Sequence, residues 1–213
     1  MEFLAAFVDI ILHLDKHLAV LVQQYGPWIY AILFFIVFAE TGLVVFPFLP
    51  GDSLLFVAGA LAAVGGMDAP TLMVSLTLAA ILGNSANYAI GRWLGPKVFA
   101  RGGRFLNAEN LAKTHAFYER HGGKAVVLSR FLPLFRTFVP FVAGVSNMNA
   151  ARFTLFNVVG ALGWVVSLTL VGYLFGNLPL VKNNLSVVIV AIVLVSFLPA
   201  GLEYLRQRRA RSA

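Results

Sequence analysis

Four ionisable side chains stand inside otherwise apolar stretches of the sequence, namely Glu40, Asp52, Arg130 and Arg136. Inside a membrane each charge costs on the order of 2.5–3.5 kcal/mol, so such groups have to be paired, hydrated or neutralised. One interpretation is a set of structural acid–arginine pairs. We favour another, a polar and water-accessible cavity where the arginines bind an anion and the acids exchange protons or cations, because buried ion pairs stabilise proteins poorly.

The residue types indicate the chemistry of such a cavity. The planar guanidinium groups of Arg130 and Arg136 stay charged when desolvated and donate paired hydrogen bonds, which suits a phosphate. Burial makes it easier for Glu40 and Asp52 to take up a proton near neutral pH, so we predict that they couple protons or cations. Asp52 has a second interpretation, because its Pro-Gly-Asp-Ser context is typical of a helix start capped by Asp52 or by the following serine.

The sequence lacks the residues that several other chemistries require. The sequence has no cysteine, which excludes disulfides, thiol nucleophiles and cysteine-ligated metals. No phosphate-binding loop, GxSxG, HExxH or GxGxxG pattern occurs. A lipid phosphatase would need a histidine near its arginines, and no histidine follows Lys124, so this enzyme is a remote alternative. We expect no enzymatic activity, no catalytic residue, no cofactor and no metal.

The composition indicates which class of protein positions these residues. Apolar residues make up 60% of the 213 positions and charged residues only 12%, with a mean hydropathy of +0.85, whereas soluble domains are about a quarter charged. We therefore expect an integral membrane protein. The net charge of +7 then orients the chain and meets anionic lipids, and we expect no nucleic-acid partner.

Uncharged stretches of about 20 residues or more predict the membrane spans. They are residues 69–91, 153–181 and 183–202. Residues 3–24 are predicted to form an amphipathic helix in the interface, and both its crossing and the side of the N-terminus stay open. Two further apolar regions, residues 28–66 and 124–148, contain prolines, which break helices. Pro47, Pro50, Gly51, Pro133 and Pro140 are therefore predicted to shape two re-entrant hairpins.

Basic residues predict the orientation of these segments. Seven lysines or arginines lie from Arg92 to Lys124 inclusive, and four arginines lie in the tail after residue 203. Both regions should be cytoplasmic by the positive-inside rule. Both regions can be cytoplasmic if residues 124–148 enter the membrane and return on the same side, because an even number of full crossings, residues 153–181 and 183–202, then separates them. The same logic places Asp68 outside.

An internal repeat accompanies the two interrupted regions. Phe56-Val57-Ala58-Gly59 recurs as Phe141-Val142-Ala143-Gly144, and each copy precedes a span that ends in a glycine pair, Gly91/Gly95 or Gly172/Gly176. Broken segments at matching positions of two halves are typical of transporters with a site at the bilayer midplane. We therefore predict an all-α integral membrane protein with an inverted repeat of two re-entrant hairpins, each followed by a transmembrane helix.

The predicted organisation has three parts. Residues 1–26 form the N-terminal amphipathic helix, residues 27–181 the membrane domain, and residues 182–213 a C-terminal transmembrane helix with a basic cytoplasmic tail. The repeat halves within the membrane domain cover about residues 28–95 and 124–176, and the basic cytoplasmic loop covers residues 92–123.

Several of these motifs together resemble the DedA family of bacterial inner-membrane proteins, also called the SNARE-associated or VTT superfamily. The resemblance covers about residues 28–180 and rests on the order and spacing of its motifs. The matching segments are Glu40-Thr41-Gly42, Phe48-Leu49-Pro50-Gly51-Asp52-Ser53-Leu54-Leu55, Gly91-Arg92-Trp93-Leu94-Gly95, Arg130-Phe131, Arg136-Thr137, Pro140, Ala143-Gly144, Ala151-Arg152-Phe153, Asn157, Trp164 and Gly172-Tyr173.

The resemblance implies two re-entrant hairpins that face each other and a role in the cell envelope that depends on the proton-motive force. Members are proposed to return undecaprenyl phosphate across the inner membrane, and their essential acids and arginines match Glu40, Asp52, Arg130 and Arg136. It thus implies a multi-pass inner-membrane protein with a cytoplasmic C-terminus. Its expected partners are a lipid phosphate, protons and membrane lipids, with a homo-oligomer left open.

Two alternative functions stay open beside this one. The first is a proton-coupled transporter of ions or cationic drugs, which the acids fit but the arginines do not. The second is a purely structural assembly factor, in which the four charged residues only hold the halves together.

Overall fold

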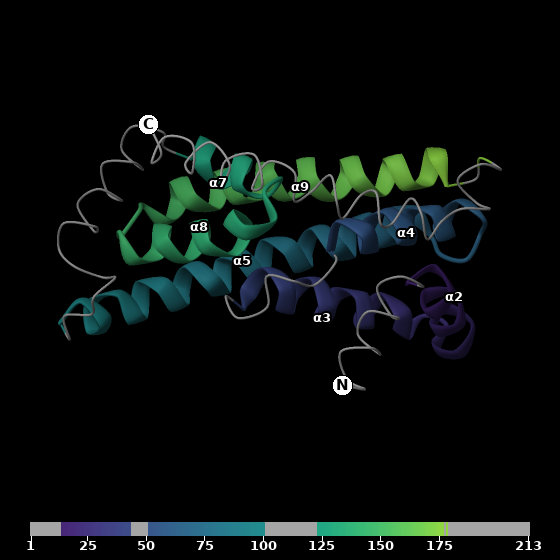
Figure 1. The fold of residues 1–213 in the computed structure, drawn as a ribbon, viewed down its shortest axis with the longest axis horizontal. Coiled ribbons are helices and arrows are strands. Elements are labelled where there is room, and N and C mark those ends of the chain that lie inside the picture. The colour runs from purple at the N-terminus through teal and green to yellow at the C-terminus, as the bar shows by residue number, and fades with distance from the viewer. Residues whose placement is uncertain (1–13, 44–50, 101–122, 177, 179–213) are drawn as a thin grey trace, which may run out of the picture. The chain divides into compact units, whose positions relative to one another are not determined.

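The computed structural model describes residues 14–43, 51–100, 123–176 and 178. Every regular element in these ranges is a helix, as the sequence predicts. In chain order the helices are α2 (Leu14–Tyr25), α3 (Trp28–Gly42), α4 (Gly51–Ala63), α5 (Ala69–Ala100), α7 (Lys124–Ser129), α8 (Pro133–Val145) and α9 (Ala150–Phe175), shown in Figure 1. Two stretches, Ala69–Leu94 and Ala150–Phe175, are long and apolar enough to cross a membrane.

The helices that contain two of the predicted spans have ends that differ from the prediction. Helix α5 begins where expected but continues beyond Arg92, so the region expected as a basic loop starts as a helix. Helix α9 begins before the expected Phe153, because its first turn accommodates the exposed Arg152. The predicted span at 183–202, the basic tail and residues 3–13 lie outside the described residues.

Each proline-containing region contains two described helices, α3 and α4 in the first and α7 and α8 in the second. Pro47 and Pro50 precede α4 and lie outside the described residues. In the second region, α8 begins at Pro133, and the preceding Leu132 is extended with φ −120° and ψ 106°, a conformation that a following proline favours. Pro140 lies inside α8 and does not end this helix.

Helices at matching positions of the two halves begin and end alike. Asp68 Oδ2 and Asn149 Oδ1 cap α5 and α9, each accepting a hydrogen bond from the backbone N–H three residues later, at 2.9 and 3.1 Å. Helices α4 and α8 both end in a Schellman turn. The left-handed residue of that turn is Gly65 in one case (φ 81°) and Asn147 in the other (φ 53°).

The exposed cap of α5 makes a pH-dependent contribution to stability. Hydrogen bonds from the side chain and backbone of Thr71 lower the pKa of Asp68. The contribution is therefore present above about pH 4, the ordinary range of an aspartate, and is lost as the pH falls through the lowered pKa. Asp68→Asn keeps an acceptor but does not titrate, so its thermal midpoint should fall less than that of the wild type between about pH 5 and pH 3. Equal acid sensitivity of the two proteins would contradict this assignment.

Packing divides the chain into two compact units. Unit 1 comprises residues 1–34, 49–76 and 165–213, and unit 2 comprises residues 35–48 and 77–164. Each unit therefore combines segments from both halves of the sequence. Helices α5 and α9 each supply residues to both units.

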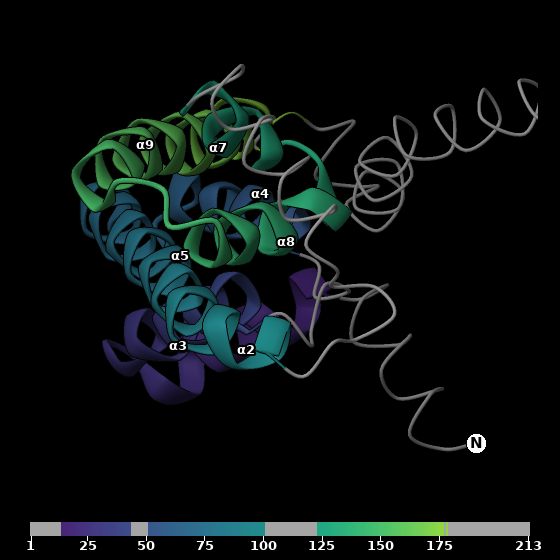
Figure 2. The ribbon, with the colours of Figure 1, turned by 90° about the vertical axis from the view of Figure 1, so that its left-hand side faces the viewer.

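Glycines bring helices into backbone contact in both units. In unit 1, a Cβ added at Gly172 would overlap the Phe56 carbonyl oxygen, so α4 packs closely against the end of α9 (Figure 1). In unit 2, a Cβ at Gly91 would overlap the Phe141 carbonyl oxygen, so α8 packs closely against α5 (Figures 1 and 2). Each copy of the repeated Phe-Val-Ala-Gly sequence thus contacts the glycine of the span that follows the other copy.

Candidate functional site

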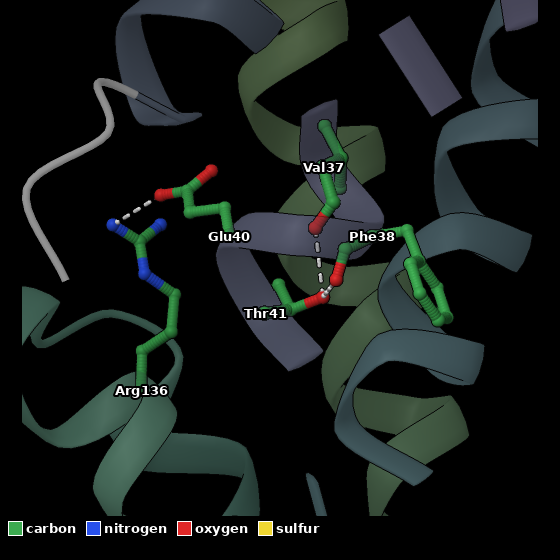
Figure 3. Close-up of polar contacts among 5 residues, drawn as sticks. All are labelled: Val37, Phe38, Glu40, Thr41 and Arg136. Atoms are coloured by element: carbon green, nitrogen blue, oxygen red, sulfur yellow. Dashed lines mark hydrogen bonds and ion pairs between the residues drawn. The ribbon is translucent and has the colours of Figure 1, made fainter. Parts of the chain in front are cut away.

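Unit 2 contains a buried ion pair between α3 and α8. Arg136 Nη2 lies 3.1 Å from Glu40 Oε1, and the two side chains are only 3% and 1% exposed (Figure 3). The guanidinium carbon of Arg136 also lies 5.1 Å from the ring centroid of the buried Trp164 on α9, within the range of a cation–π interaction. Two residues that the sequence analysis singled out are therefore in contact.

The ends of α3 and α8 position this pair. Glu40 lies in the last turn of α3, where the hydroxyl of Thr41 donates a hydrogen bond back to the Val37 carbonyl at 2.8 Å (Figure 3). Arg136 lies in the first turn of α8, and its backbone N–H donates to the Leu132 carbonyl at 2.9 Å. The break in the helix before Pro133 therefore determines the position from which the Arg136 side chain extends.

A buried amide connects the two helices beside the ion pair. The Asn87 side chain, on α5, donates hydrogen bonds to the carbonyls of Thr41 at 3.2 Å and Thr137 at 2.7 Å. These carbonyls belong to the residues next to Glu40 and Arg136. Asn87 thereby ties α3 to α8 at the level of the charges. It also supplies a donor to the turn of α8 where proline weakens the helical hydrogen bonds.

The second arginine has neutral partners. Arg130 follows α7 and is 1% exposed. Its Nη2 donates to Asn157 Oδ1 on α9 at 2.6 Å and to the Ala80 carbonyl on α5 at 3.2 Å. Within the described part of the chain, its Nε and Nη1 have no hydrogen-bond partner. The buried guanidinium of Arg130 thus has hydrogen-bond donors that these residues do not use.

The charges of this region do not cancel. Among the described residues, Glu40, Arg130 and Arg136 are the buried ionisable side chains that carry a formal charge at neutral pH. Two buried cations are therefore accompanied by one buried anion among these residues. An excess positive charge in a low-dielectric interior favours a bound anion. Anion binding at the two arginines stays a prediction.

The remaining predicted residues lie elsewhere. Asp52 belongs to unit 1 and is half-buried in the first turn of α4. Because α4 already begins at Gly51, the prediction that Asp52 or Ser53 caps this helix is wrong, although an acid in the first turn is still favourable there. Among the described residues, no group of three or more acidic or histidine side chains has the arrangement of a metal site.

The sequence analysis missed the buried amides. Asn84 and Asn87 lie in the uncharged stretch 69–91, which was assessed by its lack of charge, and Asn157 was noted only for its place in a family motif. All three are fully buried in unit 2. A search of the predicted spans for polar side chains as well as charged ones would have found them, because membrane-buried amides also need partners.

Comparisons with known proteins identify the family. The VTT domain family matches residues 49–174. Protein DedA of Escherichia coli K12 is 51% identical over 213 residues, covering 99% of this chain and 97% of that protein. Inner membrane protein YqjA of the same strain is 41% identical over 152 residues, covering 71% of this chain and 69% of YqjA.

An uncharacterized membrane protein of Mycobacterium leprae is 44% identical over 166 residues, covering 78% of this chain and 74% of that protein. No solved structure matches the chain. Two of these three relatives are named as membrane proteins, which agrees with the two apolar helices long enough to span a bilayer. The chain is a membrane protein that belongs to the DedA family and carries its VTT domain.

Proposed function

We propose that this protein returns undecaprenyl phosphate, or a similar polyprenyl or lipid phosphate, across the bacterial inner membrane for envelope synthesis, driven by the proton-motive force. The observation that carries the proposal is Arg130, a buried cation with neutral partners whose Nε and Nη1 donors have no partner among the described residues. A phosphate monoester supplies the anion and the acceptors that this group needs. The protein is not an enzyme in this proposal.

The membrane potential explains why protons would be required. Moving one negative charge inward against an inside-negative potential costs about 2.3 kcal/mol per 100 mV. A lipid phosphate carries one or two negative charges, so its inward movement is uphill unless protons accompany it. Glu40 and Asp52 are the acids that we assign to this coupling.

The proposed architecture consists of two re-entrant hairpins in an inverted repeat, with the C-terminus in the cytoplasm. Helices α3, α4 and α8 have 15, 13 and 13 residues, fewer than the roughly 20 that a span requires. The equivalent caps, Schellman turns and glycine contacts of the two halves support a repeat.

A leaflet-resolved assay of undecaprenyl phosphate in proteoliposomes with an imposed pH gradient tests the proposal. Wild-type protein should move the lipid only with the gradient. Arg130→Lys keeps the charge but not the planar fork, so transport should fall at least about tenfold, the equivalent of one charge-assisted hydrogen bond. Arg152→Lys, the same change at an exposed position of α9, is the matched control and should transport normally.

Each alternative function gives a different result in the same vesicles. Release of inorganic phosphate would indicate a lipid phosphatase. Movement of cations or cationic drugs without lipid movement would indicate the ion or drug transporter. Absence of any transport by correctly folded wild-type protein would indicate an assembly factor and would refute the proposal.

A further inference from the structure

Asn157 holds its side chain in one orientation opposite Arg130. Its Nδ2 donates to the Ile81 carbonyl at 3.0 Å and to Ser85 Oγ at 3.2 Å. The Ser85 hydroxyl itself donates to the Ile81 carbonyl at 2.7 Å, so its oxygen is left as an acceptor for the amide. A flipped amide would place its oxygen against two acceptors and its NH₂ against the arginine. Asn157 Oδ1 is therefore fixed toward Arg130 Nη2.

The same face of α9 accommodates the rest of the arginine side chain. Gly160 follows Asn157 by one helical turn, and a Cβ added there would lie 3.0 Å from Arg130 Cδ and 3.2 Å from Nε. Glycine thus lets the arginine side chain pack directly against α9, where a Cβ would crowd Cδ and Nε. Nε has no hydrogen-bond partner among the described residues. Helix α9 therefore contacts both the guanidinium, through Asn157, and the stem of the arginine side chain, at Gly160.

The two arginines differ in the charge of their side-chain partners. Arg136 contacts the carboxylate of Glu40, whereas Arg130 contacts the amide of Asn157. A carboxylate at position 157 would have nearly the same shape and would bind a guanidinium more strongly. It would also cancel the charge that favours an anion. An amide fixes the position of the guanidinium and leaves its charge uncompensated.

From this contrast we propose that Asn157 is a positioning residue that orients Arg130 through a neutral acceptor and so reserves its positive charge for an anionic phosphate headgroup. The proposal deepens the proposed function and rests on it for the class of ligand. Gly160 supports the same arrangement by letting the arginine side chain pack against α9. Neither residue has to touch the ligand.

Asn157→Asp tests this proposal, because it keeps the size and the acceptor while adding a negative charge. Binding of undecaprenyl phosphate and of the uncharged alcohol undecaprenol is measured with purified protein in nanodiscs at matched folded concentration. We expect the phosphate affinity to fall at least about tenfold with binding of the alcohol unchanged. The thermal midpoint should not fall in parallel with the phosphate affinity.

Asn149→Asp provides the matched control on the same helix. It makes the same amide-to-acid change at the exposed cap of α9, where an acid is also a good cap, and should leave both affinities unchanged. If Asn157→Asp binds undecaprenyl phosphate as well as the wild type does, Asn157 is only a structural hydrogen-bond partner. Should that variant not fold, Asn157→Ser removes the amide that holds the guanidinium, so it should weaken phosphate binding and leave alcohol binding unchanged. Phosphate affinity equal to that of the wild type would overturn the proposal.

Binding and transport separate this inference from the proposed function. Wild-type protein that binds the phosphate in preference to the alcohol, but moves no lipid in vesicles, would refute the transport function and leave the role of Asn157 intact. Wild-type protein without a preference for the phosphate would overturn the inference, because Arg130 would then hold no anion.

Discussion

Glu40→Gln should lower the stability of the protein by about 3–5 kcal/mol, the cost of leaving one member of a buried ion pair without its counter-charge. Glu40 and Arg136 are almost completely buried and 3.1 Å apart. The glutamine keeps the size of the glutamate but removes the charge that balances Arg136. Equilibrium unfolding or thermal midpoints of the purified protein in one detergent would measure the loss.

A second substitution should recover most of that stability. In Glu40→Gln with Arg136→Met, both charges are removed, and buried pairs replaced by uncharged residues of similar volume are often as stable as the original. The four proteins of this double-mutant cycle give the coupling energy of the pair. Transport by the doubly substituted protein distinguishes structure from function, because a purely structural pair would leave transport intact once the fold is restored.

Two control substitutions test whether the length of the acidic side chain and its location in the protein matter. Glu40→Asp keeps the charge but shortens the side chain by one methylene, so it should cost less than Glu40→Gln. Asp52→Asn changes a half-buried acid of the other unit and should cost less still. Equal stability of Glu40→Gln and the wild type would show that other groups satisfy Arg136.

Charges were the features of the site that the sequence revealed most directly. Glu40, Arg130 and Arg136 are conspicuous because they interrupt apolar stretches, and all three are buried in unit 2. Their partners could not be predicted in the same way. Arg130 is held by an amide of α9 and by the backbone carbonyl of Ala80 on α5, and a backbone carbonyl has no signature in the sequence.

Helix starts show a similar difference between local and long-range information. Asp68 marked the beginning of α5 correctly, because its cap is made within three residues. The start of α9 was placed too late, because Arg152 was treated as the boundary although Asn149 caps the helix before it. An exposed charge in a first turn does not end a helix. Local capping was the better guide at both helix starts.

Gly91→Ala and Gly172→Ala should each cost about 1–3 kcal/mol, the usual range for forcing extra atoms into a packed interior. In both cases the added Cβ would overlap a backbone carbonyl oxygen, of Phe141 in unit 2 and of Phe56 in unit 1. A backbone atom cannot rotate away as a side chain can, so the helices must separate. For a chain of this size the thermal midpoint should fall by about 2–4 °C per kcal/mol.

Gly163→Ala is the matched control, because an added Cβ there would meet nothing within 4 Å on the same helix as Gly172. Alanine is favoured over glycine in a helix by up to about 1 kcal/mol, so this variant should be at least as stable as the wild type. The two tight glycines occupy equivalent positions of the repeat, and so their substitutions should have similar costs in the two units. A large loss for one and none for the other would mean that the repeated sequence does not produce repeated packing, and that the close contact of α4 with α9 or of α8 with α5 is not a requirement of the fold.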